Sequence, residues 1–94
     1  MSPRLNVGTP KGVPYTFIRL SGRDVIRALC TFGFEVVNTR GSHAKLRRIA
    51  PDGSRQVLTL PLHDELAAGT LHAIYRQALR YVPAGELRPH FFTD

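Results

Sequence analysis

The sequence predicts an α+β fold in which two helices pack on one face of a three-stranded antiparallel sheet. Three observations predict it: an apolar stripe at helical spacing, three strand-like segments separated by tight turns, and a second apolar stripe after the last strand. No internal repeat and no second domain interrupts this order. The 94 residues, 43% of them hydrophobic, are enough for one small domain with one modest core.

The first predicted helix begins at Ser21. Ser21 and Asp24 match the capping-box pattern, in which each side chain bonds to the backbone N–H of the other residue. The next apolar residues recur at helical spacing and predict a buried stripe: Val25, Ile26, Leu29 and Cys30. We therefore expect Cys30 to be a small buried hydrophobe and Gly33 to end the helix.

Three strands are predicted next, over residues 34–39, 43–49 and 55–60. The first is rich in aromatic and β-branched residues, which favour strands. Residues 40–42 and 51–54 contain Gly or Pro at positions that suit tight turns. Pro61 is expected to stop the third strand.

The second predicted helix begins at Thr70, a good N-cap residue, and ends at Pro83. Its core-facing residues follow the i, i+3, i+4, i+7, i+8, i+11 pattern: Leu71, Ile74, Tyr75, Ala78, Leu79 and Val82. Beyond Pro83, we expect the stretch with His90, Phe91 and Phe92 to dock onto the core.

Residues 1–19 are expected to be a flexible basic extension, because their Pro and Gly residues show no periodicity. The short apolar run at 15–18 either lies against the domain or adds an edge strand. We expect no membrane association, because no run reaches the length of a spanning helix and residues 1–20 lack the apolar region of a signal peptide. The single cysteine cannot form an intrachain disulfide and indicates a reducing cytoplasm.

The positive charge of the chain is concentrated in its N-terminal 20 residues and in residues 40–55. The net charge of +6 favours an acidic partner. Strand alternation places His43, Lys45 and Arg47 in a row on one side of the second strand. An imidazole that titrates near neutral pH beside a row of cations is suited to chemistry on a polyanion such as RNA.

RNA supplies its own nucleophile, the 2′-hydroxyl next to the scissile phosphate. We therefore expect His43 to act as general base or acid, and Lys45 and Arg47 to hold the phosphate. Neighbouring cations disfavour the imidazolium, which favours the role of base and predicts 2′,3′-cyclic phosphate ends. His63 is either a second acid, base or phosphate contact, or a structural loop histidine. A zinc site of His43, His63 and His72 is not expected, because no Cys or carboxylate has ligand-like spacing with them.

Five short segments between Leu20 and Val82 resemble the HicA family of toxins, which are messenger-RNA interferases. They are Leu20-Ser21-Gly22, Gly33-Phe34, Gly41-Ser42-His43, Pro61-Leu62-His63 and Gly69-Thr70-Leu71 with Ile74. The resemblance identifies residues 20–94 as the toxin domain and implies a double-stranded-RNA-binding-like fold. It also implies endoribonuclease activity without a required metal or other cofactor, and inhibition by a HicB-type antitoxin.

On this resemblance His43 is the catalytic histidine. The expected RNA-binding residues around it are Gly41, Ser42, Lys45, Arg47, Arg40 and His63. The loop 62–68 carries acids where many relatives are basic, and the N-terminal extension is an addition, so both bear on the choice of RNA.

Two other functions agree with the same residues. One is a non-catalytic RNA-binding module that reads duplex shape through phosphate and 2′-hydroxyl contacts. The other is a protein-interaction domain whose basic face serves only an acidic partner.

Overall fold

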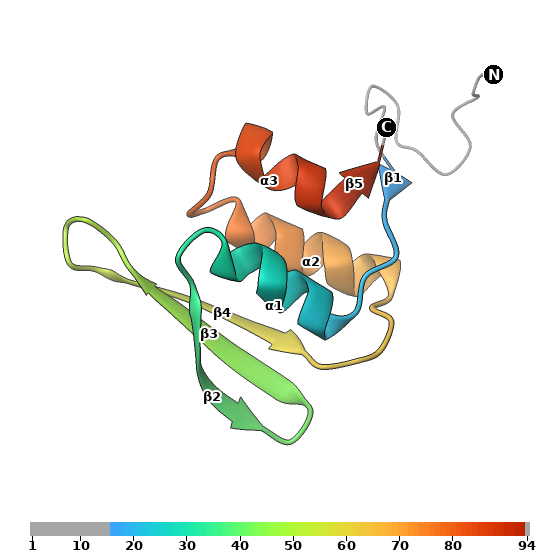
Figure 1. The fold of residues 1–94 in the computed structure, drawn as a ribbon, viewed down its shortest axis with the longest axis horizontal. Helices are drawn as coiled ribbons and strands as arrows, with labels where there is room; N and C mark the ends of the chain where they lie inside the picture. Colours follow the sequence, from blue (N-terminus) through green and yellow to red (C-terminus); the bar gives the residue numbers. More distant parts are fainter. Residues whose placement is uncertain (1–15, 94) are drawn as a thin grey trace.

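The main sheet of the protein is antiparallel, with strand order β2-β3-β4, and helices cover one of its faces (Figure 1). The computed structural model describes residues 16–93, so the first 15 residues of the extension expected at residues 1–19 lie outside the described residues. The elements in chain order are β1 (Thr16–Phe17), α1 (Gly22–Cys30), β2 (Glu35–Arg40), β3 (His43–Ile49), β4 (Arg55–Pro61), α2 (Ala68–Ala78), α3 (Ala84–Phe91) and β5 (Phe92–Thr93). The α+β class and the helix–three strands–helix order are thus confirmed, with a third helix added after them.

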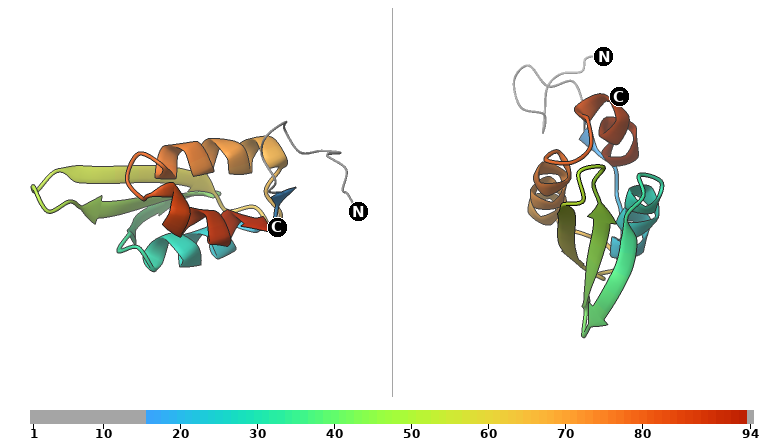
Figure 2. Two further views of the ribbon diagram at one scale, coloured as in Figure 1. Left: turned by 90° about the horizontal axis from the view of Figure 1, so that it is seen from above. Right: turned by 90° about the vertical axis from the view of Figure 1, so that its left-hand side faces the viewer.

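The molecule has three layers: the sheet, then α1 and α2 side by side, then α3 across the seam between these two helices (Figure 2). The core lies between the layers. Its buried side chains come from every helix, from β3 and β4, and from the segments between elements. All of those in the described residues are apolar: Val25, Leu29, Phe34, Ala44, Leu46, Leu58, Leu60, Leu66, Leu71, Ile74, Ala78, Val82, Leu87 and Phe91.

Helix α1 begins as expected, with a capping box at Ser21. The Ser21 hydroxyl accepts a hydrogen bond from the Asp24 N–H (3.0 Å), and the Ser21 N–H donates to an Asp24 carboxylate oxygen (2.9 Å). The expected burial of Cys30 is wrong, because this residue is exposed at the end of the helix. The buried stripe is centred on Val25 and Leu29, and Cys30 lies about 100° further around the helix than Leu29.

Helix α2 begins earlier than expected. Ala67 occupies the N-cap position without a side-chain hydrogen bond, so the assignment of Thr70 as N-cap is wrong. The buried residues Leu66 and Leu71 stand at the N′ and N4 positions, the pair that forms a hydrophobic staple. A staple can therefore set this helix start in place of a polar cap.

The C-terminal stretch docks onto the core as expected, but it does so as the helix α3. Leu87 and Phe91 are its fully buried residues. Helix α2 already ends at Ala78, and Pro83 is the N-cap residue of α3 rather than the end of α2. Pro89 lies inside α3. Because proline is strongly unfavourable inside a helix, the sequence pattern does not predict a helix here.

The apolar run at 15–18 does not join the main sheet. Thr16 and Phe17 pair with Phe92 and Thr93, so that β1 and β5 form a separate two-stranded sheet. The Phe17 ring stacks on Phe92 at a centroid distance of 4.4 Å. This small sheet fastens the start of the described chain to its end.

The strand boundaries differ slightly from the expected ones. Strand β2 begins one residue later, because Phe34 turns into the core just before it, and β4 includes Pro61. The pairing of β2 with β3 contains an irregularity between Val36 and Asn38. The tight turn between these strands is as expected, with Gly41 at a φ of +57°.

Candidate active site and nucleic-acid interface

The face of the sheet that turns away from the helices carries the expected row of polar side chains. Residues along β3 alternate strictly from His43 to Arg47: His43, Lys45 and Arg47 are exposed, whereas Ala44 and Leu46 are buried against the helices. We call His43, Lys45 and Arg47 the sheet row. The structure thus brings together three of the residues that the sequence singles out.

The neighbouring strands add charge to this row. Antiparallel pairing places each residue of β3 opposite one residue of β2 and one of β4, and opposed side chains lie on the same face. The pairs across the row are His43 with Arg40 and Pro61, Lys45 with Asn38 and Thr59, and Arg47 with Glu35 and Val57. Arg40 is therefore the cation directly beside His43.

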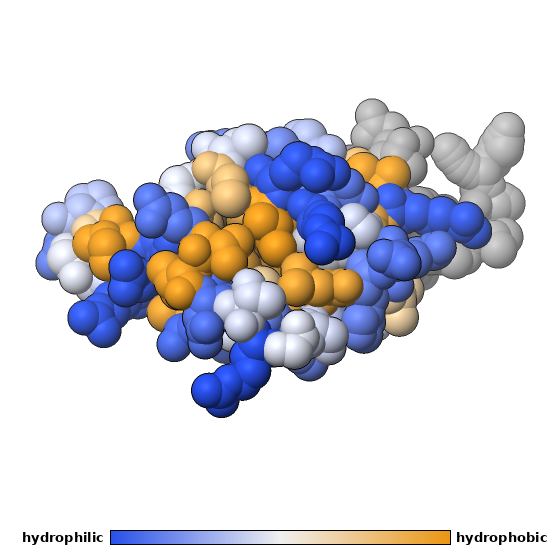
Figure 3. Space-filling view, turned by 60° about the horizontal axis from the view of Figure 1, so that its bottom comes forward, coloured by the Kyte–Doolittle hydropathy of each residue, from blue (hydrophilic) through white to orange (hydrophobic). Residues whose placement is uncertain are grey.

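The far end of the open face adds an apolar side chain. Ile49 is opposite Arg55 and is 54% exposed, so an apolar side chain follows the cations along β3. Figure 3, in which the sheet side comes forward, shows apolar patches bordered by hydrophilic side chains. The open face therefore offers both charge and apolar area to a partner.

The end of the sheet at His43 is held in place by backbone hydrogen bonds. The Ser42 carbonyl accepts from the Leu62 N–H (2.6 Å), and the His63 carbonyl accepts from the Gly22 N–H (2.9 Å). A side chain at Gly22 would not fit, because its Cβ would lie 2.3 Å from the Pro61 carbonyl oxygen. The first turn of α1, the β2–β3 turn and the end of β4 thus form one fixed platform under the histidine.

The imidazole of His43 is exposed on this platform. Within residues 16–93 it makes no hydrogen bond, ion pair or ring contact. Since no group of residues 16–93 is bonded to either ring nitrogen, the imidazole is open to a ligand on the outer side of the sheet.

His63 lies on the loop that follows β4, two residues beyond Pro61, the cross-strand partner of His43. Its side chain is exposed and forms no hydrogen bond, ion pair or ring contact within residues 16–93, whereas its backbone carbonyl is bonded to Gly22. The acids of the same loop include Glu65, which is 3.7 Å from Arg19. Both side chains of this pair are mostly exposed, at 88% and 62%, so it adds little to stability.

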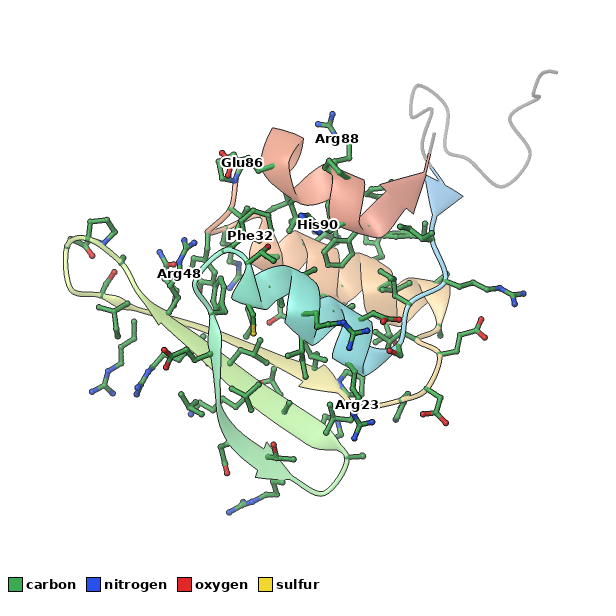
Figure 4. The ribbon with its side chains drawn as sticks, viewed as in Figure 1. Arg23, Phe32, Arg48, Glu86, Arg88 and His90 are labelled. Carbon is green, nitrogen blue, oxygen red and sulfur yellow. The ribbon has the colours of Figure 1, made fainter. Side chains whose placement is uncertain are left out.

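Arg48, one of the charges of the basic segment, does not belong to the open face. It turns toward the helices, where its guanidinium donates to the carbonyls of Phe32 (2.9 Å) and Tyr81 (2.8 Å) and to the Gln56 side chain (2.7 Å). It also lies 5.0 Å from the centre of the Phe34 ring. Figure 4 shows Arg48 beside the loop that carries Phe32.

Strand alternation in the sequence already separates Arg48 from Lys45 and Arg47. Arg48 stands an even number of residues from Ala44 and Leu46, so its side chain points to the same side of the sheet as theirs. Its donors are already used inside the fold. The cationic surface of the open face is therefore smaller than the charge of the segment indicates.

Within residues 16–93, no three His, Cys, Asp or Glu side chains gather closely enough to hold a metal ion. In the same residues, no helix is both long enough and apolar enough to cross a lipid bilayer.

Comparison with known proteins gives one match. The family model described as the HicA toxin of bacterial toxin–antitoxin systems matches residues 22–79. Searches of the curated proteins and of the solved structures found no match. The matched segment spans α1, the whole main sheet and α2, which together hold the platform and the sheet row. Since it covers more than half of the chain, the protein belongs to the HicA family of toxins of bacterial toxin–antitoxin systems.

Proposed function

We propose that this toxin is an endoribonuclease that cleaves messenger RNA without a metal ion, with His43 as its proton-transfer group. The observation that carries the proposal is the exposed imidazole at the head of the sheet row, with Arg40 directly beside it. This activity requires contact with messenger RNA, so we expect the toxin to act in the cytoplasm.

The reaction that fits this site is an internal attack within the RNA. His43 removes the proton of the 2′-hydroxyl, and the 2′-oxygen forms a bond to the adjacent phosphorus. The bond from phosphorus to the 5′-oxygen then breaks, and the leaving oxygen takes up a proton from the imidazolium or from water. The products are a 2′,3′-cyclic phosphate and a 5′-hydroxyl, and proton transfer by His43 contributes about 10²–10⁴-fold to the rate.

The cations of the open face lie at different distances from His43. Arg40 is the cross-strand neighbour of His43, so its side chain begins about 5 Å away and is best placed for the scissile phosphate. Lys45 and Arg47 follow along β3 in steps of about 7 Å, which suits contact with the next phosphates along the strand. A guanidinium can stabilise the charge that develops on the phosphate during attack.

Membership of this toxin family implies an antitoxin partner. We propose that the partner is of the HicB type and covers the open face, so that His43 is inaccessible in the complex. The supporting observation is that the open face combines cations that form no ion pair within residues 16–93 with exposed apolar area at Ile49, which is the composition of a protein interface.

The activity is tested with the His43→Gln variant and with Thr59→Ala as the matched control on the same face. Thr59 is exposed opposite Lys45 and has no proton to transfer near neutral pH. We expect induced expression of the wild type and of Thr59→Ala to arrest growth, and expression of His43→Gln to have no effect. In vitro, His43→Gln should bind RNA as the wild type does but cleave it about 10²–10⁴-fold more slowly.

A substrate with a single 2′-deoxy sugar at the mapped cut site checks the mechanism. It should resist cleavage, cleavage of normal RNA should persist in EDTA, and the ends should carry 2′,3′-cyclic phosphate. Normal cleavage of the 2′-deoxy substrate would refute the internal attack. Binding of RNA without cleavage by the wild type would show a non-catalytic RNA-binding module instead.

A further inference from the structure

We propose that the outward face of α2 is a second contact site for the phosphate backbone of RNA, separate from the sheet row. We call this site the helix row and define it as His72, Arg76 and Arg80. The identity of its ligand rests on the proposed function, because RNA is the polyanion that the toxin would act on.

The three residues lie on one side of α2 and of the turn that follows it. His72 and Arg76 are spaced at i and i+4, so their side chains lie one above the other along the helix, and Arg80 follows four residues later in the turn. The opposite side of the helix carries the buried residues Leu71, Ile74 and Ala78. The helix row is therefore exposed to solvent. Helix α2, which carries most of it, lies on the other side of the molecule from α1 (Figure 2).

A shallow groove accompanies the helix row. It is lined by Gly69, His72, Ala73, Arg76, Gln77 and Arg80. The small residues make the groove, since Ala73 is short and a Cβ placed on Gly69 would meet no atom within 4 Å. An elongated ligand can thus approach the helix backbone between the long side chains.

The charge of the helix row is not neutralised by the described part of the chain. Residues 66–85 contain no Asp or Glu. The side chains of Arg76 and Arg80 form no hydrogen bond or ion pair with any residue of 16–93. On α1, by contrast, the Arg27 guanidinium is bonded to the carboxylate of Asp24. The outward face of α2 is therefore a cationic surface, whereas this arginine of α1 is already paired.

The spacing favours a nucleic-acid strand over an acidic protein surface. His72 and Arg76 are one turn apart, about 6 Å along the helix axis, a distance similar to that between phosphates along a nucleic-acid strand, and Arg80 follows in the turn after α2. Arginine binds phosphate with two parallel hydrogen bonds. Helix α2 packs against β4, one of the two edge strands of the main sheet, so an RNA strand that passes this edge of the open face comes next to α2.

The test measures RNA affinity as a function of salt concentration in the His43→Gln background, which prevents cleavage. The Arg76→Gln/Arg80→Gln variant is compared with Arg27→Gln, an exposed helical arginine whose charge is already paired. The probe is a single-stranded RNA of about 20 nucleotides, longer than one binding site of about 4–16 nucleotides. Thermal unfolding of each variant checks that the fold is unchanged.

We expect the double variant to lower the slope of log K against log salt by about 1.4, because each lost phosphate contact on a single strand removes about 0.7. Arg27→Gln should leave the slope unchanged. With His43 restored, the double variant should raise KM for the long RNA and leave kcat the same.

An unchanged slope and affinity in the double variant would overturn the helix row as an RNA contact, even if the wild type cleaves RNA. A wild type that binds RNA through Arg76 and Arg80 but never cleaves it would refute the endoribonuclease and leave the helix row standing. If the double variant instead loses only affinity for the antitoxin, the helix row is a protein-binding surface and the inference is wrong.

Discussion

Replacement of Arg48 by alanine should be among the most destabilising single changes on the main sheet. Arg48 joins β3 to the loop after α1 through Phe32 and to the segment between α2 and α3 through Tyr81. Hydrogen bonds that involve a charged group contribute about 1.5–3 kcal/mol each. The cation–π contact with Phe34 adds about 0.5–1 kcal/mol.

These contributions must be reduced, because the site is only half-buried and water can reach the freed carbonyls. We therefore expect a loss of about 2–4 kcal/mol, a large share of the roughly 5–15 kcal/mol that stabilises a domain. Arg48→Lys should recover only part of this, because an ammonium lacks the planar fork that reaches several acceptors at once.

The assay is urea unfolding, in which the midpoint and the slope give the free energy of unfolding. The control is Arg47→Ala, the adjacent cation, which points to the open face and should change stability by less than about 0.5 kcal/mol. The reasoning would be refuted if the two alanine variants unfolded at the same urea concentration. In the folded Arg48→Ala protein, the catalytic rate should remain that of the wild type.

Three further outcomes are expected. Gly22→Ala should destabilise the protein by about 1–3 kcal/mol in urea unfolding, because its Cβ would press on the Pro61 carbonyl; Gly69→Ala, on open surface, should be neutral or stabilising. Asp24 should contribute stability that is present at neutral pH and lost as the pH falls below about 4, because the Ser21 N–H, then the Ser21 hydroxyl and the nearby Arg27 lower the pKa of this carboxyl in the folded state. Asp24→Asn should remove this part of the acid dependence when unfolding is followed between neutral and acidic pH; an unchanged profile would show that Asp24 is not its cause. On the proposed mechanism, Arg40→Gln should lower kcat more than Arg47→Gln does, measured at saturating RNA.

The parts of the fold that the sequence predicts best are those set by local chemistry. The capping box at Ser21 and the alternation along 43–47 depend on neighbouring residues alone, so they can be read from the chain. The start of α2 could not be read in this way, because buried apolar residues flank it and no polar cap marks it. Helix α3 was missed because Pro89 lies inside it and its burial depends on distant parts of the core.

The candidate site shows the same division between local and distant causes. The direction of the sheet row follows from strand alternation, but the proximity of Arg40 to His43 requires the pairing register of β2 with β3. The fixed platform under the histidine depends on contacts between residues about 40 positions apart, Gly22 with Pro61 and His63. Such contacts leave no local pattern in the sequence.

The basic segment of the chain serves two purposes because strand alternation divides it between two environments. Lys45 and Arg47 remain available to a ligand, whereas Arg48, one residue further, has its donors bonded within the fold. The helix row contributes fewer charges to the sequence than the basic segment does, but no ion pair within residues 16–93 neutralises them. A count of charges along the chain therefore overstates the cationic surface of the sheet and overlooks that of α2. Under the proposed function this second surface matters, because RNA contacts away from the cut site would raise affinity without altering the chemistry proposed for His43.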